Sequence, residues 1–162
     1  MIKKTVLSSI IFLSASSVIY AKTTSYVGGG LGVGGYGQQS GLNGASANIF
    51  AGKGNYIDKD EKIYVGGELG AGYTYQSGHN NAFGLSASIM PGLMITNSTM
   101  LYGRLGVATS YIHKKSMAFG PQYGVGLQTN VAKNWDVRTE YTSFVAANHS
   151  SQIGAGLVYK FD

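Results

Sequence analysis

Three glycines near the N-terminus have the spacing that cradles a dinucleotide pyrophosphate. In "YVGGGLGVGGYG" they are Gly30, Gly32 and Gly35, which match G-x-G-x-x-G. This motif binds phosphate only where a strand precedes the glycines and a helix follows them, because the N-terminus of that helix holds the phosphate. Downstream, "YGQQSGLNG" is turn-like and has no helical apolar period. The sequence therefore predicts no nucleotide site, and the glycines need another explanation.

The histidines could support two other kinds of chemistry. A metal centre would require His79, His113 and His149 to converge, but no Asp, Glu or Cys in the surrounding segments could complete a ligand set. His149 and Ser151 have the spacing H-x-S, in which a histidine can act as base for a serine nucleophile. That chemistry also needs an acid to orient the base. We predict no metal and no cofactor, and we keep His149 and Ser151 only as catalytic residues of an alternative, enzymatic function.

The composition points to a surface that meets something other than water. Only 12% of the residues are charged, whereas about a quarter are charged in a typical soluble domain. Glycine (25 residues) and tyrosine (12 residues) are abundant, and cysteine is absent, which excludes disulfides and thiol chemistry. The net charge is +5, two units of which come from Lys3 and Lys4 near the N-terminus. We expect no nucleic-acid partner.

The first 21 residues have the pattern of a secretory signal peptide. Lys3 and Lys4 form a basic start, an apolar stretch runs from Val6 to Val18, and Ala21 suits cleavage. The apolar stretch is shorter than the ~20 residues that a membrane-spanning helix needs. We therefore predict a cleaved signal peptide at 1–21 and a single domain at 22–162.

The rest of the chain alternates with a period of two, which predicts β-strands. In "IYVGGELGAGYTY", Ile63, Val65 and Leu69 share one face, while Gly66 and Glu68 lie on the other. Turn signals divide the chain into eight such runs, each long enough to cross a bilayer as a tilted strand of about 9–11 residues. The predicted strands are 24–34, 42–53, 62–75, 82–95, 99–112, 117–130, 134–145 and 151–161.

Residue parity indicates which face of each strand meets lipid. If odd-numbered residues point outward, the outer wall is apolar, the reverse of a soluble protein. Five charged residues then point inward: Glu68, Arg104, Arg138, Glu140 and Lys160. A soluble β-sandwich also alternates, but it would expose its second face to water, and here that face is mostly Gly, Ser and Thr. The sequence therefore predicts an all-β, eight-stranded antiparallel transmembrane β-barrel. In so narrow a barrel, the inward glycines Gly28, Gly30 and Gly32 are expected to make room for bulkier neighbours.

Aromatic residues gather near both ends of the predicted strands, as in the two interfacial girdles of membrane proteins. At the end away from the chain termini they are Tyr73, Tyr75, Phe83, Tyr111 and Phe119, and at the end near the termini they are Trp135, Tyr159 and Phe161.

Four charged residues are predicted to point into the lumen and to form an ion network. They are Glu68, Arg104, Arg138 and Glu140, two of each sign. Because unpaired buried charges are very costly, the first expectation is that these residues pair and plug the lumen. The alternative is that they line a narrow ion path.

One stretch resembles a known family. "YGVGLQTNVAKNWDVRTEYTSF" is similar to the OmpA-like and opacity-protein (OmpX-like) outer-membrane barrels, which carry a G-x-G strand, a turn ending in Asn-Trp, and Arg-x-Glu-Tyr. The matching residues are Gly124, Gly126, Asn134, Trp135, Arg138, Glu140 and Tyr141. The resemblance implies a Gram-negative outer-membrane location and a similar internal ion network. It also implies outer-membrane lipids, lipopolysaccharide and the barrel-insertion machinery as partners, and leaves room for a surface ligand that the sequence does not identify.

These observations predict a non-enzymatic outer-membrane barrel that serves envelope integrity or surface interaction. One alternative is a lipid-A-modifying hydrolase, because small barrels that deacylate lipid A use a similar H-x-S pair followed by a glutamate. Here no glutamate follows Ser151, and Glu140 is predicted to face inward. The other alternative is a small ion-conducting porin.

Overall fold

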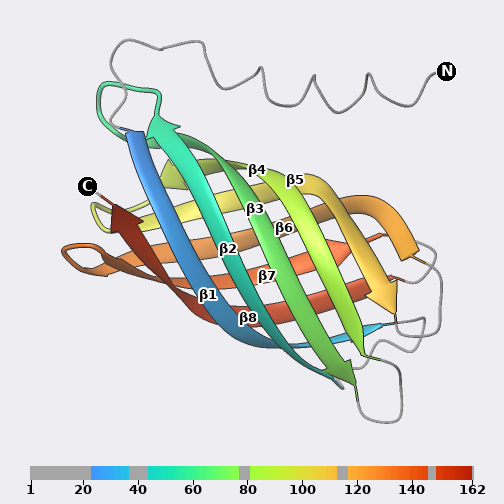
Figure 1. Cartoon of the computed structure of the whole chain (residues 1–162). Coiled ribbons are helices and arrows are strands. Elements are labelled where there is room, and N and C mark those ends of the chain that lie inside the picture. The colour runs from blue at the N-terminus through green and yellow to red at the C-terminus, as the bar shows by residue number, and fades with distance from the viewer. Residues whose placement is uncertain (1–22, 37–43, 77–80, 113–116, 146–148, 162) are drawn as a thin grey trace, which may run out of the picture.

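The chain forms eight long antiparallel strands, as predicted. A computed structural model describes residues 23–36, 44–76, 81–112, 117–145 and 149–161. The predicted signal peptide, His79 and His113 lie outside the described residues. Figure 1 shows the strands in chain order. They are β1 (Thr23–Tyr36), β2 (Gly44–Tyr56), β3 (Ile63–Gln76), β4 (Ala82–Met94), β5 (Thr99–Ile112), β6 (Met117–Ala132), β7 (Trp135–Phe144) and β8 (Ser150–Phe161).

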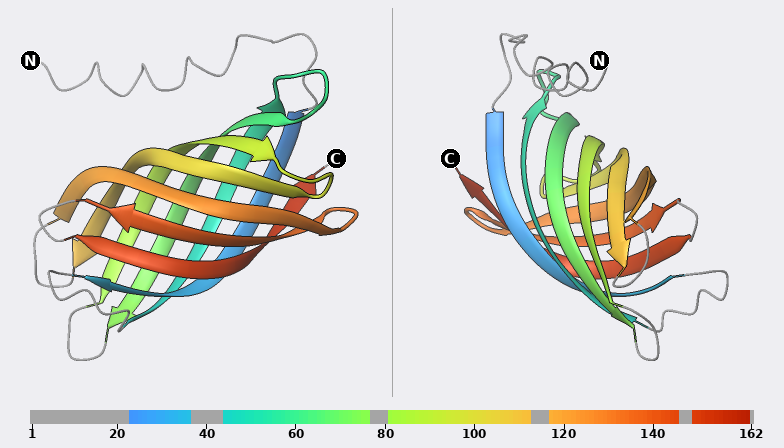
Figure 2. Two further views of the ribbon diagram at one scale, coloured as in Figure 1. Left: turned by 180° about the vertical axis from the view of Figure 1, so that it is seen from behind. Right: turned by 45° about the vertical axis from the view of Figure 1, so that its right-hand side comes forward.

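The sheet closes into a barrel because the first strand pairs with the last. Each strand is hydrogen-bonded to its neighbour in sequence, and β1 is also hydrogen-bonded to β8. Ser25 of β1 lies opposite Phe161 of β8, so the start of β1 and the end of β8 share one end of the barrel. We call this the terminal end and the opposite one the far end. The views in Figure 2 show the strong tilt of the strands around the closed wall.

The parity prediction for the two faces is confirmed. The large apolar side chains that the structure exposes all have odd numbers, for example Leu31, Leu69 and Phe119, which are 72%, 67% and 65% exposed. The buried apolar side chains all have even numbers, such as Met90 and Tyr102. The wall is thus apolar outside and closed at its edges, as lipid requires. No helix in the described part of the chain is long and apolar enough to cross a membrane.

The outer wall also carries the predicted aromatic residues at both ends. Tyr73, Phe83 and Phe119 are exposed toward the far end. At the terminal end, Trp135 and Tyr159 pack edge to face with ring centroids 5.1 Å apart, and Tyr159 packs against Phe161 at the same separation.

The three turns at the terminal end are stabilised by hydrogen bonds between short side chains and the backbone. Asp58 Oδ1 accepts from the amides of Lys62 and Ile63, at 2.8 and 2.7 Å, which holds the turn between β2 and β3. Between β4 and β5, Thr96 Oγ1 accepts from the amide of Thr99 at 3.0 Å. Asn134, before β7, donates through Nδ2 to the carbonyl of Lys160 at 2.9 Å and ties that turn to β8.

The glycines of the G-x-G-x-x-G stretch lie within a continuous strand, β1, and the next described element is another strand, β2. For Gly28 the packing prediction is confirmed, because a Cβ added there would collide with the ring of Phe50. Gly30 has a different reason: its added Cβ would lie 2.8 Å from the carbonyl oxygen of Ala155 on β8. Gly28 therefore makes room for the ring of Phe50, and Gly30 lets the backbone of β8 approach closely.

Candidate functional site: the lumen ion network

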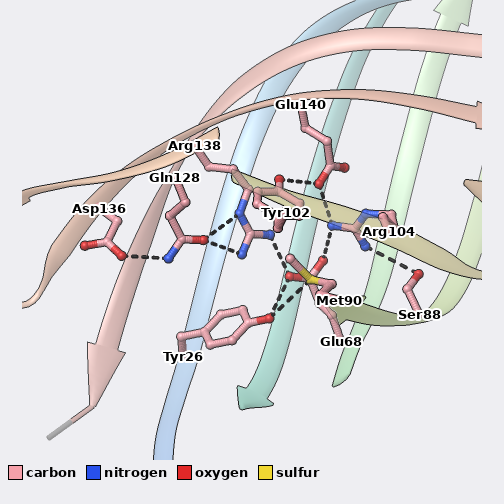
Figure 3. Close-up of polar contacts among 10 residues, drawn as sticks. All are labelled: Tyr26, Glu68, Ser88, Met90, Tyr102, Arg104, Gln128, Asp136, Arg138 and Glu140. Carbon is pink, nitrogen blue, oxygen red and sulfur yellow. Dashed lines mark hydrogen bonds and ion pairs between the residues drawn. The ribbon is translucent and has the colours of Figure 1, made fainter. Parts of the chain in front are cut away.

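The four charged residues predicted to point inward meet in the middle of the barrel. Glu68 comes from β3, Arg104 from β5, and Arg138 and Glu140 from β7; all have even numbers and therefore face the lumen. Arg138 Nη1 lies 2.6 Å from Glu68 Oε2. Arg104 Nη2 lies 2.6 Å from Glu68 Oε1 and 2.8 Å from Glu140 Oε2. Charges thus alternate along one chain, Arg138–Glu68–Arg104–Glu140, which is drawn in Figure 3.

These ion pairs are almost completely withdrawn from solvent. The side chains of Glu68, Arg138 and Arg104 are 2%, 5% and 6% exposed, and that of Glu140 is 15% exposed. At such burial the loss of hydration is compensated only when each charge has a close partner of opposite sign and further hydrogen bonds. Pairing at 2.6–2.8 Å meets the first condition.

Neutral side chains supply the further hydrogen bonds. The Tyr26 hydroxyl donates to Glu68 Oε2 at 3.1 Å, and the Tyr102 hydroxyl donates to Glu140 Oε2. The guanidinium of Arg138 also lies over aromatic rings, 4.4 Å from the centroid of Phe50 and 5.3 Å from that of Tyr102. Both cation–π contacts and hydrogen bonds to ions strengthen in a desolvated site.

The network extends toward the terminal end through three further residues, of which the sequence analysis placed Lys160 inward but assigned none to the network. Gln128 accepts from Arg138 Nη2 at 2.8 Å and donates to Asp136 Oδ2 at 2.6 Å. Asp136 Oδ1 in turn pairs with Lys160 Nζ at 2.8 Å. The signal that could have revealed them is their even numbering, which places all three on the same face as Arg138.

An apolar cluster, also unforeseen, fills the lumen on the terminal side of the ion network. Its buried members are Tyr64, Met90, Met100 and Tyr102, of which Met90 and Tyr102 are 0% and 1% exposed. Tyr56 and Met94 pack against it nearer the terminal end. Charged pairs and this cluster together obstruct the bore in the described part of the barrel.

The candidate hydrolase pair lies elsewhere. His149 is exposed beside the start of β8, and Ser151 is half-buried in that strand. Between these two described side chains the structure contains no hydrogen bond. Glu140 accepts from Arg104 and Tyr102 inside the lumen. Among the described residues no group of three His, Cys, Asp or Glu side chains is placed to hold a metal ion.

A closed barrel with an apolar outer wall, interfacial aromatic residues and a polar interior is the architecture of an integral outer-membrane protein. The chain belongs to the family of the outer membrane protein beta-barrel domain, whose family model matches residues 5–161. Its fold is that of a small, eight-stranded outer-membrane barrel. No curated protein matches the sequence significantly.

Solved structures share this fold at low sequence identity. Ail, the attachment invasion locus protein of Yersinia pestis, has a TM-score of 0.63 and 17% identity over 86% of this chain and 99% of Ail. Neisserial surface protein A has a TM-score of 0.59 and 16% identity over 88% of this chain and 99% of its own. The outer-membrane enzyme PagL has a TM-score of 0.57 and 15% identity, over 83% of this chain and 98% of PagL. At these identities the likeness shows the fold alone.

Proposed function

We propose that the protein is a non-enzymatic outer-membrane barrel that contributes to envelope integrity or to interactions at the cell surface, with its partners among outer-membrane lipids and lipopolysaccharide. The observation that carries this proposal is the filled interior. A bore that holds paired charges and an apolar cluster is suited to a stable membrane plug. It is not suited to bulk transport.

The apolar wall supports the same proposal. Every strand exposes large apolar side chains on the outer face: Leu, Ile, Val or Phe on seven strands, and Trp135 and Tyr141 on β7. Lys53 of β2 is an exception, exposed on the outer wall toward the terminal end, where a lysine can extend its ammonium group to the lipid headgroups. We expect the barrel-insertion machinery to be the partner that inserts this apolar wall into the membrane.

Planar bilayer recordings test the proposal against the small-porin alternative. We expect the purified barrel to give no large, steady conductance steps, because the Arg138–Glu68–Arg104–Glu140 chain and the cluster behind it obstruct the path. Water exclusion from such a bore makes ion passage costly. Large single-channel steps from the pure protein would replace the proposal with the porin function.

A lipid-A mass profile tests the proposal against the hydrolase alternative. The profile of cells that produce the protein is compared with that of cells lacking it and of cells with His149→Ala or Ser151→Ala. We expect the four profiles to be identical, because Glu140, the acid nearest in sequence, is already bound by Arg104 and Tyr102. Loss of a fatty acid from lipid A that depends on His149 and Ser151 would establish the enzyme instead.

A further inference from the structure

The two halves of the barrel interior differ sharply. On the terminal side of the ion network, tyrosine and methionine side chains fill the space. On the far side, the inward residues are mostly small, and they leave a cavity of about 140 Å³ that reaches from the ion network toward the far rim. That volume is roughly ten times what a single water molecule needs. We call this space the vestibule; its wall includes Asn48, Gly72, Ser86, Ala108, Ser110 and Gln122.

The floor of the vestibule carries no net charge. Glu68, Arg104, Arg138 and Glu140 all border it, and each is already paired with an opposite charge. An anion that approached Arg104 would also meet the carboxylates of Glu68 and Glu140, and a cation would meet the two guanidinium groups. The floor thus favours neither sign and suits a neutral ligand.

The wall presents polar atoms that lack protein partners. Within the described part of the chain, Asn48 Oδ1, Gln122 Oε1, Ser110 Oγ and Arg104 Nε are buried and accept or donate no hydrogen bond. As whole residues, Ser110 and Arg104 are only 4% and 5% exposed, and both line the vestibule. Buried polar groups of native proteins nearly always have partners, so four in one cavity indicate a place where such partners bind.

The types of these atoms define what can satisfy them. Two are amide oxygens that accept, one is a guanidinium N–H that donates, and the hydroxyl does both. Hydroxyl groups match this set, since each can donate to an amide oxygen and accept from an N–H. Phe50 and Phe144 add apolar surface to the same wall, which suits the C–H face of a sugar ring.

We propose that the vestibule is a binding site for a small, neutral polyhydroxylated ligand, of the size of a polyol or a single sugar ring, that enters from the far end. Its base is closed by the ion network and the apolar cluster, so the ligand binds without crossing the barrel. This inference is independent of the proposed function, because it requires neither membrane stabilisation nor a surface partner.

Titration by NMR tests the site directly. The full-length barrel is placed in phosphatidylcholine nanodiscs, because glycoside detergents carry sugar headgroups that would compete. Glycerol, xylitol and glucose are added, with glucuronate and glucosamine as charged comparators. We expect saturable shifts of the Ser110 and Gln122 backbone amides with the neutral compounds, and weaker binding of both charged sugars. The absence of saturable shifts with every neutral compound, or tighter binding of a charged sugar, would overturn the proposal.

Filling the vestibule locates the site. Ala108 is 9% exposed and lines the cavity, so Ala108→Phe should weaken binding at least about tenfold. The matched control is Ala47→Phe, which adds the same ring to the exposed outer wall of β2 and should leave the affinity unchanged. Wild-type affinity in a folded Ala108→Phe barrel would place the binding outside the vestibule and contradict the proposal.

A second variant separates binding from folding. Ser110→Ala removes a hydroxyl that has no partner in the described protein, so the ligand-free barrel should unfold at the same denaturant concentration as wild type or a higher one. Its affinity for the polyol should fall about three- to tenfold, the equivalent of one hydrogen bond. Unchanged affinity would show that Ser110 does not contact a ligand and would count against the site even if Ala108→Phe failed to fold.

Discussion

Replacing Arg138 by methionine is expected to lower the free energy of unfolding by about 3–5 kcal/mol, the usual cost of removing one partner from a buried ion pair. Methionine keeps the unbranched apolar stem but removes the charge. Glu68 would lose the guanidinium 2.6 Å away, and its side chain is only 2% exposed, so water could not replace that partner. Gln128 would also lose its two hydrogen bonds from Arg138.

Unfolding in urea, in phospholipid vesicles, measures this loss through the fluorescence of Trp135, the only tryptophan of the chain. Arg138→Lys is the matched control: it keeps the charge but cannot reach Glu68 and Gln128 together, so an intermediate loss is expected. An Arg138→Met barrel as stable as wild type would show that the pair contributes nothing to folding.

The contacts also identify the correct compensating change. In the Arg138→Met background, Glu68→Gln removes the carboxylate that has lost one of its two guanidinium partners and should recover part of the stability. Glu140→Gln should recover less, because Glu140 pairs with Arg104 and makes no ion pair with Arg138. Equal recovery by the two variants would mean that only the net charge of the lumen matters and that the individual pairs do not.

The barrel itself could be predicted from the sequence because one physical rule acts on every strand. Lipid requires apolar side chains at alternate positions, so the residue types of Leu69 in β3 and Phe119 in β6 are enough to predict that both side chains point outward. Strand ends are less constrained. β2 was expected to end at residue 53 and continues to Tyr56, which lies opposite Tyr64 of β3 in the ladder.

The interior was harder to predict because its residues do not share one chemical rule. Tyrosine occurs on both faces: Tyr111 is exposed to the membrane side, whereas Tyr102 is 1% exposed inside. Numbering places Glu68, Arg104, Arg138 and Glu140 in the lumen, but their pairing depends on how far each side chain reaches along the barrel axis. Asp136 illustrates the limit, since its number places it inward while its partners Gln128 and Lys160 are fixed only by strand register.

Large rings in the lumen also explain why two inward positions are glycine. Gly54 of β2 and Gly66 of β3 lie opposite each other, and the ring of Tyr64 covers both. A Cβ added at Gly66 would lie 2.6 Å from the Tyr64 hydroxyl oxygen, and one added at Gly54 would lie 2.6 Å from Cε2 of the same ring. Tyr56 packs edge to face on Tyr64, with ring centroids 5.5 Å apart, which limits how far the ring can move aside.

We therefore expect substitutions at Tyr64 and Gly54 to lower the free energy of unfolding. A double-mutant cycle measures both losses and how far one depends on the other. Tyr64→Ala should cost about 3–5 kcal/mol of unfolding free energy, as for other buried aromatic side chains, because it empties the space between Met90, Met100 and Tyr102. Gly54→Ala should cost about 1–3 kcal/mol in the wild type, since the methyl group overfills the lumen against the ring. In the Tyr64→Ala background the same glycine change should cost almost nothing, because the nearest atoms that it would meet all belong to Tyr64. If Gly54→Ala is equally costly with and without the ring, the glycine serves the strand backbone rather than the packing of Tyr64.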